Sequence, residues 1–427
     1  MAQLSDDCFA FGGDLMPTDE ALAILDERLS PVVVAETVPL RGTCGRILAE
    51  NMTAECFVPP YDNAAVDGYA VYFDDLDPQV ETLLPVTGRI SAGHPLNRPP
   101  RRGEALRIFT GAPVPGGGNT PDSDTGPDTI LMQEDCREEG AHVAISPGIS
   151  CGANLRRKGE DMKPGDAVLE QGRRLRPQEI GLAASLGCTA LSVYKPLSVA
   201  VFSSGDEIRD PGEELPEGAI YDVNRYGLFA LLEGLGCSVT DLGILADDEA
   251  TVAEALAKAA PDHGLILTSG GVSTGEEDHI RAAVESLGSL YFWRLSIKPG
   301  RPLAMGQVGS TPFMGLPGNP VAVMVTFLRF ARPAILKLSG ATDLQPVLFR
   351  VRAAFSQKKK IGRREWVRAR LAQGLSGELV AEKFPRQGSG ILSSMVAADG
   401  LVELAEDVSH VAEGDMVDFL PFREVLS

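Results

Sequence analysis

Basic side chains are scarce in this sequence relative to acidic ones. The 427 residues include 39 lysines and arginines against 59 aspartates and glutamates, so the formal net charge is −20. A surface with this charge repels nucleic acid and anionic membranes. We therefore expect no nucleic-acid partner and no membrane partner.

Long hydrophobic runs are also missing. The best candidate, residues 321–328, is stopped by Arg329, Arg332 and Pro333, far short of the roughly 20 residues that span a membrane. The N-terminus carries three aspartates instead of the basic segment of a signal peptide. The seven cysteines form no C-x-x-C pair, a pattern typical of reduced thiols in a cytoplasmic protein.

Acidic residues are absent from one stretch of this acidic chain. Between Ser286 and Thr342 there is no aspartate or glutamate. The same stretch contains six basic residues: Arg294, Lys298, Arg301, Arg329, Arg332 and Lys337. This local concentration of positive charge indicates a site for a small polyanion.

Three glycine-containing loops in and beside this stretch have the composition of an anion site. They are Ser269–His279, Ile297–Pro302 and Leu316–Pro320. Glycine lets backbone N–H groups approach a phosphate closely. The first loop has neither the Walker A nor the G-x-G-x-x-G spacing, which argues against an ordinary NTPase or dinucleotide enzyme. Its alternative reading is a tight turn between a strand and a helix.

The other two loops carry cations and a helix start. Lys298 and Arg301 flank a Pro-Gly turn, which favours joint binding of phosphate over two solvated cations. Asn319 and Pro320 fit the N-cap and first position of an apolar helix. That helix start would point at the same anion, or it would serve helix initiation alone.

From Pro196 to about Thr342 the sequence alternates between short apolar strands and amphipathic helices. The strands are expected at residues 197–202, 237–245 and 265–268, and the helices at 225–236, 251–260 and 278–287, the first capped by Asn224. Repeated βαβ units predict a three-layer α/β/α, doubly wound and mainly parallel sheet. In such a sheet, ligands bind at the carboxyl ends of the strands.

Three acidic residues follow three successive predicted strands. They are Glu207, Asp247 and Asp278. Since the carboxyl ends of parallel strands meet at one edge, these carboxylates are candidates for a magnesium site with positions left open for a phosphate. Asp278 could instead be a helix cap.

The rest of the chain differs from the α/β segment in its hydrophobic periodicity, and we expect four domains in all. Segments 1–49 and 148–195 contain helical patterns at 18–29, capped by Thr18, and at 176–186, and together form a small linker domain. Residues 50–147 read as a β-rich second domain with a surface loop at 116–128. Residues 196–343 form the α/β domain, and 344–427 predict a small C-terminal β-barrel of five strands.

Seven sequence motifs carry a resemblance to a known family. In chain order they are PPYDNAAVDGYAV (Pro59–Val71), FTGAPVP (Phe109–Pro115), RRKGEDMKPGD (Arg156–Asp166), SSGDEI (Ser203–Ile208), LTSGGVSTGEEDH (Leu267–His279), IKPGRP (Ile297–Pro302) and LPGNPVA (Leu316–Ala322). Their order resembles that of the molybdopterin molybdenumtransferases, the MoeA family, which is similar to the E domain of gephyrin. The resemblance extends from about Thr18 to Phe422.

The resemblance implies an activity and its participants. Members insert molybdenum from molybdate into adenylylated molybdopterin, releasing AMP and molybdenum cofactor with a divalent metal, here expected to be Mg²⁺. It also implies a homodimer in which the α/β domain of one subunit and the β-rich domain of the other form the site. Molybdopterin adenylyltransferase is the expected pathway partner. The resemblance does not decide whether this chain inserts molybdenum or tungsten.

The resemblance also assigns residues to the site. Catalytic positions are Asp67, Thr110, Asp161, Glu207, Asp247, Asp278, Lys298, Arg368 and Ser389. Positions that bind the substrate pterin and its phosphates are Ser269, Gly270, Gly271, Ser273, Gly275, Arg294, Lys298, Arg301, Pro317, Gly318, Asn319 and Pro320. The family often has lysine where Arg294 and Arg301 stand, so the reach and geometry of these two cations differ from the family pattern.

Two further functions stay open at this point. One is an adenylyltransferase that makes the AMP adduct from ATP, since that enzyme shares the α/β fold but is a single domain. The other is a non-catalytic dimeric scaffold of the gephyrin E-domain type. The retained acidic and basic site residues favour the enzyme, because a scaffold does not need them.

Overall fold

The computed structural model describes residues 15–116, 126–271, 279–374 and 376–426. The chain forms two compact units. The first comprises Met1–Glu50, Gln171–Arg176 and Leu191–Ser427, and the second comprises Asn51–Glu170 and Pro177–Ala190. The finer division into four domains stays a prediction.

The second unit is built on a six-stranded sheet, as the alternating pattern of residues 50–147 predicts. Its order is β7-β4-β6-β5-β9-β8, and only β5 and β6 pair in parallel. The strands are β4 (Gly68–Val71), β5 (Thr82–Ile90), β6 (Ala105–Ile108), β7 (Thr129–Met132), β8 (Cys136–Glu139) and β9 (His142–Ile145). Both faces are packed, with Ala70 and Leu106 in one core and Tyr69 and Val71 in the other.

Short elements complete the second unit. Two antiparallel pairs join β3 (Asn63–Ala64) to β10 (Leu155–Arg156) and β2 (Met52–Thr53) to β11 (Ala167–Leu169). Helix α2 (Pro177–Ser185) lies within the helical segment predicted at 176–186.

The first unit contains the predicted α/β sheet, with order β16-β13-β17-β21-β20-β18. The first four strands pair in parallel, and β20 runs antiparallel to its neighbours β21 and β18, so the sheet is mixed but mainly parallel. The strands are β13 (Ser198–Ser204), β16 (Ser238–Leu245), β17 (Leu265–Ser269), β18 (Gly288–Arg294), β20 (Pro302–Val308) and β21 (Thr311–Leu316). Alternate residues of β13 enter different cores, Val199 and Val201 on one face and Ala200 and Phe202 on the other, as expected for a strand buried on both sides.

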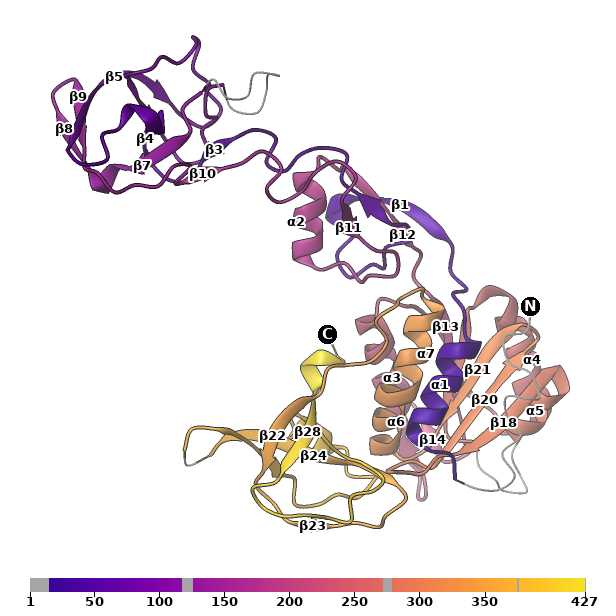
Figure 1. Cartoon of the computed structure of the whole chain (residues 1–427). Coiled ribbons are helices and arrows are strands. Elements are labelled where there is room, and N and C mark those ends of the chain that lie inside the picture. Colours follow the sequence, from indigo (N-terminus) through magenta and orange to yellow (C-terminus); the bar gives the residue numbers. More distant parts are fainter. Residues whose placement is uncertain (1–14, 117–125, 272–278, 375, 427) are drawn as a thin grey trace. The chain divides into compact units, whose positions relative to one another are not determined.

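Helices cover both faces of this sheet and confirm the three layers (Figure 1). One face carries α1 (Thr18–Arg28), α3 (Val223–Gly234), α6 (Pro320–Thr326) and α7 (Arg332–Leu338), the last two joined by a π-helical turn at Phe327–Ala331. The other face carries α4 (Glu249–Ala259) and α5 (His279–Leu287). Within the described ranges, none of the helices has the length and apolar character needed to cross a membrane.

Three helix starts differ from the sequence prediction. Asp222, not Asn224, caps α3, because its carboxylate accepts the Arg225 backbone N–H at 3.0 Å. The carboxylate of Asp248 caps α4 in the same way, so that helix begins before the predicted Thr251. Thr18 is the first residue of α1 and not its cap. Aspartate side chains two or three residues upstream therefore determine where α3 and α4 begin.

The C-terminal part of the first unit is a closed five-stranded barrel, as predicted. Its strands are β22 (Phe349–Ala353), β24 (Arg364–Gln373), β25 (Leu379–Lys383), β26 (Gly400–Leu404) and β28 (Met416–Pro421). The order β24-β25-β22-β28-β26 closes through antiparallel pairing of β26 with β24. Closure leaves no free edge among these strands.

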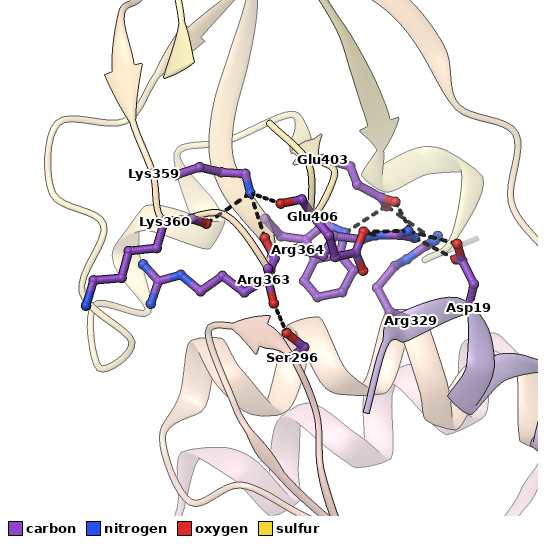
Figure 2. A network of polar contacts seen from close by, with 11 residues as sticks. Asp19, Ser296, Arg329, Lys359, Lys360, Arg363, Arg364, Glu403 and Glu406 are labelled. Carbon is purple, nitrogen blue, oxygen red and sulfur yellow. Dashed lines mark hydrogen bonds and ion pairs between the residues drawn. The ribbon is translucent and has the colours of Figure 1, made fainter. Parts of the chain in front are cut away.

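Two features join the barrel to the α/β layers. Strand β19 (Ile297–Lys298) pairs in parallel with β24, and Trp366 of β24 lies in the same core as the helices on that face. A polar network follows the same junction (Figure 2). In it, Arg364 donates to both carboxylate oxygens of Asp19 at 2.9 and 3.0 Å, and Arg329 pairs with Glu403 at 3.3 Å.

Candidate functional site

The strand register places the predicted loops at one edge of the α/β sheet. Ser204 pairs with Leu245, and Ser269 pairs with both Ser203 and Leu316, so the carboxyl ends of the four parallel strands lie in one row. The turn before β20 reaches the same edge, because β20 is antiparallel and begins there at Pro302. The structure thus brings together the acid-bearing loops, the glycine loop and the cationic turn.

Two of the three predicted metal ligands lie at this edge. Asp247 accepts a hydrogen bond from the Ser204 hydroxyl at 3.2 Å. Glu207 is exposed and curls over Gly205, where an added Cβ would come within 2.6 Å of its Oε2. Asp278 lies outside the described residues.

The donors at this edge are chemically suited to magnesium. Carboxylate and hydroxyl oxygens are the ligands that Mg²⁺ prefers. In the part of the chain that is described, no cluster of three His, Cys, Asp or Glu side chains is placed to hold a metal ion. The predicted metal set of three carboxylates therefore stays a prediction.

The glycine loop after β17 approaches the loop after β21 closely. Gly270 and Gly271 have φ values of +81° and +63°, a region that side chains other than glycine rarely adopt. A Cβ on Gly318 would lie 3.6 Å from the Gly270 Cα. The Ser269 hydroxyl is buried without a hydrogen-bond partner among the described residues. Ser273 and Gly275 lie outside those residues.

The Pro317–Pro320 loop is held by side chains and backbone from two neighbours. The Asn224 amide donates to the Gly318 carbonyl at 2.7 Å. Asn319 and Pro320 occupy the predicted N-cap and first-turn positions of α6, but the Asn319 side chain makes no capping hydrogen bond. The Val321 N–H donates to the Ser389 carbonyl at 3.0 Å, so the barrel loop rests on the start of this helix.

A pocket of about 500 Å³ lies between the cationic turn and the barrel. Three predicted catalytic residues line it: Lys298, Arg368 and Ser389. The remaining lining residues are Pro299, Gly300, Gln357, Lys358, Glu365, Trp366, Val367, Lys383, Pro385, Gln387 and Gly388. Four cations and one carboxylate are thus gathered around one cavity, which favours an anionic occupant.

Arg368 is the most unusual of these side chains. It is 1% exposed and donates to the Ser394 hydroxyl at 3.1 Å and to the Gly388 carbonyl at 3.0 Å. Neither partner is a carboxylate, and burial lowers the pKa of Arg368 to about 10. The guanidinium therefore stays charged at neutral pH without an acidic counterpart. A buried cation of this kind is stabilised when an anion binds beside it.

Glu365 is the acid of the pocket, and the sequence did not point to it. Its carboxylate lies 3.4 Å from the Lys298 ammonium and 2.6 Å from the Arg363 guanidinium. It thereby holds Lys298 against the pocket wall. Glu365 and Lys383 come from barrel strands with an ordinary alternating pattern, and Lys358 comes from the separate short strand Gln357–Lys358. Neither pattern gives a signal of a site.

Several predicted anion-binding cations lie elsewhere. Arg294 and Arg301 are exposed at the same sheet edge but do not line the pocket. Arg329 and Arg332 are buried, and Lys337 pairs with Asp26 at 2.5 Å. Only half of the acid-free basic stretch therefore lies at the sheet edge, because two of its six cations are buried and a third pairs with α1 in the same helical layer.

In the second unit the structure brings Asp67 and Thr110 together. One oxygen of the Asp67 carboxylate accepts the Thr110 N–H at 2.8 Å and the Thr110 hydroxyl at 2.7 Å. These hydrogen bonds, with a smaller contribution from the Arg107 charge, lower the pKa of Asp67. Asp161 is exposed, and no described hydrogen bond joins it to this pair.

Family models cover most of the chain. The MoeA N-terminal region (domain I and II) matches residues 16–187. The probable molybdopterin binding domain matches residues 200–337, and the MoeA C-terminal region (domain IV) matches residues 350–422. These matches include the Asp67–Thr110 pair, the sheet edge and the barrel side of the pocket.

Whole-length relatives agree with these models. The molybdopterin molybdenumtransferase of Haemophilus influenzae is 37% identical over 414 residues, covering 96% of this chain and 100% of that protein. The molybdopterin molybdenumtransferase of a Nostoc species is 35% identical, covering 89% and 87%. A crystal structure of the molybdopterin biosynthesis moeA protein of Pyrococcus horikoshii has a TM-score of 0.80 at 30% identity, covering 95% and 99%. The chain therefore belongs to the MoeA family of molybdopterin molybdenumtransferases.

Proposed function

We propose that this chain inserts molybdenum from molybdate into adenylylated molybdopterin, releasing AMP and molybdenum cofactor. Its relatives of nearly equal length are molybdopterin molybdenumtransferases. One unit of the chain contains the glycine loop after β17, the carboxylates of Glu207 and Asp247 at the sheet edge, and the cationic pocket. The adenylyltransferase alternative does not require the second unit, whereas the family match includes it.

The observation that carries the proposal is the pocket shared by Lys298, Arg368 and Ser389. Molybdate is a small dianion, and Arg368 offers a charge that no carboxylate neutralises. Lysine adds a point charge, and the Ser389 side chain can donate one hydrogen bond. Tungstate has the same charge and shape, so this geometry favours neither oxoanion over the other.

The residues at the sheet edge have separate tasks in the reaction. The Gly271 backbone N–H and the dipole of the helix that begins at Pro320 would orient the phosphates of the adenylylated pterin. Lys298 would neutralise charge that develops as AMP leaves. Glu207, Asp247 and Asp278 would hold Mg²⁺, which when bound supplies positive charge to polarise the pyrophosphate. Molybdenum becomes bonded to the two dithiolene sulfurs, and one molybdate oxygen leaves with the two thiol protons as water. Attack of water or of a molybdate oxygen on the pyrophosphate breaks the link to AMP, which leaves.

The Asp67–Thr110 pair completes the proposed site from a second subunit. We propose a homodimer in which this pair faces the sheet edge of its partner, excluding water and orienting the pterin. Asp161 would contribute a further acid. The adenylylated substrate would come from a molybdopterin adenylyltransferase.

Two pocket variants test this function. In Arg368→Gln and Lys298→Gln, the molybdate concentration that gives half-maximal AMP release should rise about tenfold or more, as expected when a charged hydrogen bond is lost. Arg370→Gln is the control, because Arg370 lies on the same strand but is exposed and pairs with Glu382. Unchanged molybdate dependence in both pocket variants would contradict the proposal. Adduct formation from ATP and molybdopterin without molybdate would favour the adenylyltransferase instead.

A further inference from the structure

One face of the second unit's sheet carries a row of stacked cationic and aromatic side chains. Tyr69 of β4 and Arg107 of β6 are register partners, and Arg107 is also the partner of Arg89 on β5. The Arg107 guanidinium lies 4.9 Å from the ring centres of both Tyr69 and Phe109. The Arg89 guanidinium lies 4.5 Å from the Phe109 ring. We call Arg89, Arg107 and Phe109 the arginine stack.

The two arginines of the stack form no salt bridge with a carboxylate in the described part of the chain. Arg107 donates to the Gly68 carbonyl at 3.3 Å and to the Gln133 side-chain oxygen, and Arg89 contacts the Phe109 ring. Four other arginines of the same unit pair with acids: Arg98 with Glu104, Arg102 with Asp74 and Asp75, Arg137 with Glu81 and Glu139, and Arg157 with Asp62. Asp67 is close enough for the Arg107 charge to help lower its pKa, but it makes no ion pair with either arginine. The guanidinium N–H groups of the stack therefore stay available to an anion.

The stack adjoins the Asp67–Thr110 pair. Thr110 directly follows Phe109, and the Gly68 carbonyl that Arg107 contacts belongs to the residue after Asp67. The Gln133 backbone N–H donates to the Asp67 carbonyl at 3.0 Å. Arg89 is exposed, and Arg107 and Phe109 are half-buried. The cations are therefore accessible beside residues that the family resemblance places at the site.

We propose that the arginine stack binds phosphate oxygens of the adenylylated pterin. Stacking on a ring fixes the plane of a guanidinium. Arg89 can therefore present its N–H edge to a phosphate in the bidentate manner, and each terminal nitrogen of Arg107 keeps one further N–H beside its bonds to Gly68 and Gln133. The inference rests on the proposed function and extends it, because it adds a phosphate-binding surface on the second unit. Molybdate would remain in the pocket lined by Arg368, in the other unit.

The substitutions that test the stack are Arg89→Gln, Arg107→Lys and the double variant Arg89→Gln/Arg107→Gln. Arg102→Gln is the matched control, since Arg102 also lies over a ring, 4.5 Å from that of Tyr72, but pairs with Asp74 and Asp75. The full-length protein is titrated calorimetrically with inorganic pyrophosphate, and its thermal midpoint checks folding. The double variant should bind pyrophosphate at least about tenfold more weakly, or lose one binding event, while Arg102→Gln behaves as wild type.

Steady-state kinetics give a second readout. The KM for adenylylated molybdopterin should rise about tenfold or more in the double variant, and the KM for molybdate should not change. Wild-type pyrophosphate binding in a folded double variant would overturn the inference, as would a change in the molybdate KM alone. If the wild-type chain shows no transferase activity, the proposed function fails, and the pyrophosphate titration still decides whether the stack binds phosphate.

Discussion

At the residue scale, the environment of a charge determines what it can bind. Arg368 was assigned from the resemblance, and the structure adds that its guanidinium is buried between a hydroxyl and a carbonyl without an acid. Glu365 was missed, although it contacts Lys298. No sequence pattern could reveal this pair, because the two residues lie 67 positions apart and meet only through pairing of β19 with β24.

Thr110→Val should raise the pKa of Asp67 toward its ordinary value. The variant removes the hydroxyl donor but keeps the backbone donor, so part of the depression remains. Titration of the Asp67 carboxyl carbon by NMR measures this directly, and Thr129→Val, which removes a hydroxyl remote in sequence from Asp67, is the control. An unchanged pKa would contradict the hydrogen-bond explanation.

The sign of the linked stability effect is fixed by the direction of this shift. Asp67 has a lowered pKa in the folded chain, so it contributes stability above the unfolded pKa of about 3.9. That contribution is lost as the pH falls through the folded pKa. Thr110→Val should therefore be less stable than wild type near neutral pH, and its deficit should shrink in acid.

At the element scale, the local hydrophobic periodicity predicted the helices and strands. Pairing between strands far apart in the sequence determined which residues meet at the site. The five barrel strands and the βαβ units follow from alternating and helical periodicity. The barrel's closure does not, because β24 pairs with β26 some 30 residues later in the chain, as Ala369 with Gly400 shows. Helix starts were less predictable, since Asp222 and Asn224 both resemble caps, and the backbone geometry selected Asp222.

Gly300→Ala should displace the cationic turn for two reasons, the positive φ at Gly300 and the contact of the added Cβ with α6. Gly300 has a φ of +80°, and an added Cβ would lie 3.1 Å from Ala322 and Thr326 atoms of α6. Gly309→Ala is the control, because its φ is +60° but an added Cβ would meet no atom within 4 Å. Both variants should lose roughly 1 kcal/mol in the free energy of unfolding from the backbone conformation.

Only Gly300→Ala should also weaken molybdate-dependent AMP release, because the displaced turn moves Lys298. We expect a loss of about tenfold, comparable to one misplaced charged contact. Urea unfolding and the AMP-release assay separate the two effects. Equal activity in the two variants would show that packing of the turn on α6 does not position Lys298.

At the scale of the first unit, buried polar contacts hold the barrel against the α/β layers. Arg364 joins Asp19, Glu403 and Glu406, and Arg329 reaches Glu403 (Figure 2). The pocket has walls from both parts, so its shape depends on this junction. The acid-free stretch suggested that Arg329 belongs to an anion site, and the structure instead pairs it with an acid more than 70 residues later in the chain.

Arg364→Met should destabilise the protein strongly. Removing the guanidinium leaves the largely buried Glu403 with fewer partners, and breaking such a pair costs about 3 kcal/mol or more. Arg370→Met on the same strand should change the free energy of unfolding by less than about 1 kcal/mol, since its pair with Glu382 is exposed. Urea unfolding compares the two. Equal losses would mean that the network does not stabilise the junction.

The most direct measurement incubates the purified full-length protein with adenylylated molybdopterin, molybdate and Mg²⁺. AMP release is followed alongside reactivation of a cofactor-free molybdenum enzyme. We predict that both increase with molybdate and that each AMP released accompanies one active cofactor. Two results would contradict molybdenum insertion by this chain. One is the absence of AMP release, and the other is AMP release that does not depend on the molybdate concentration and yields no active cofactor.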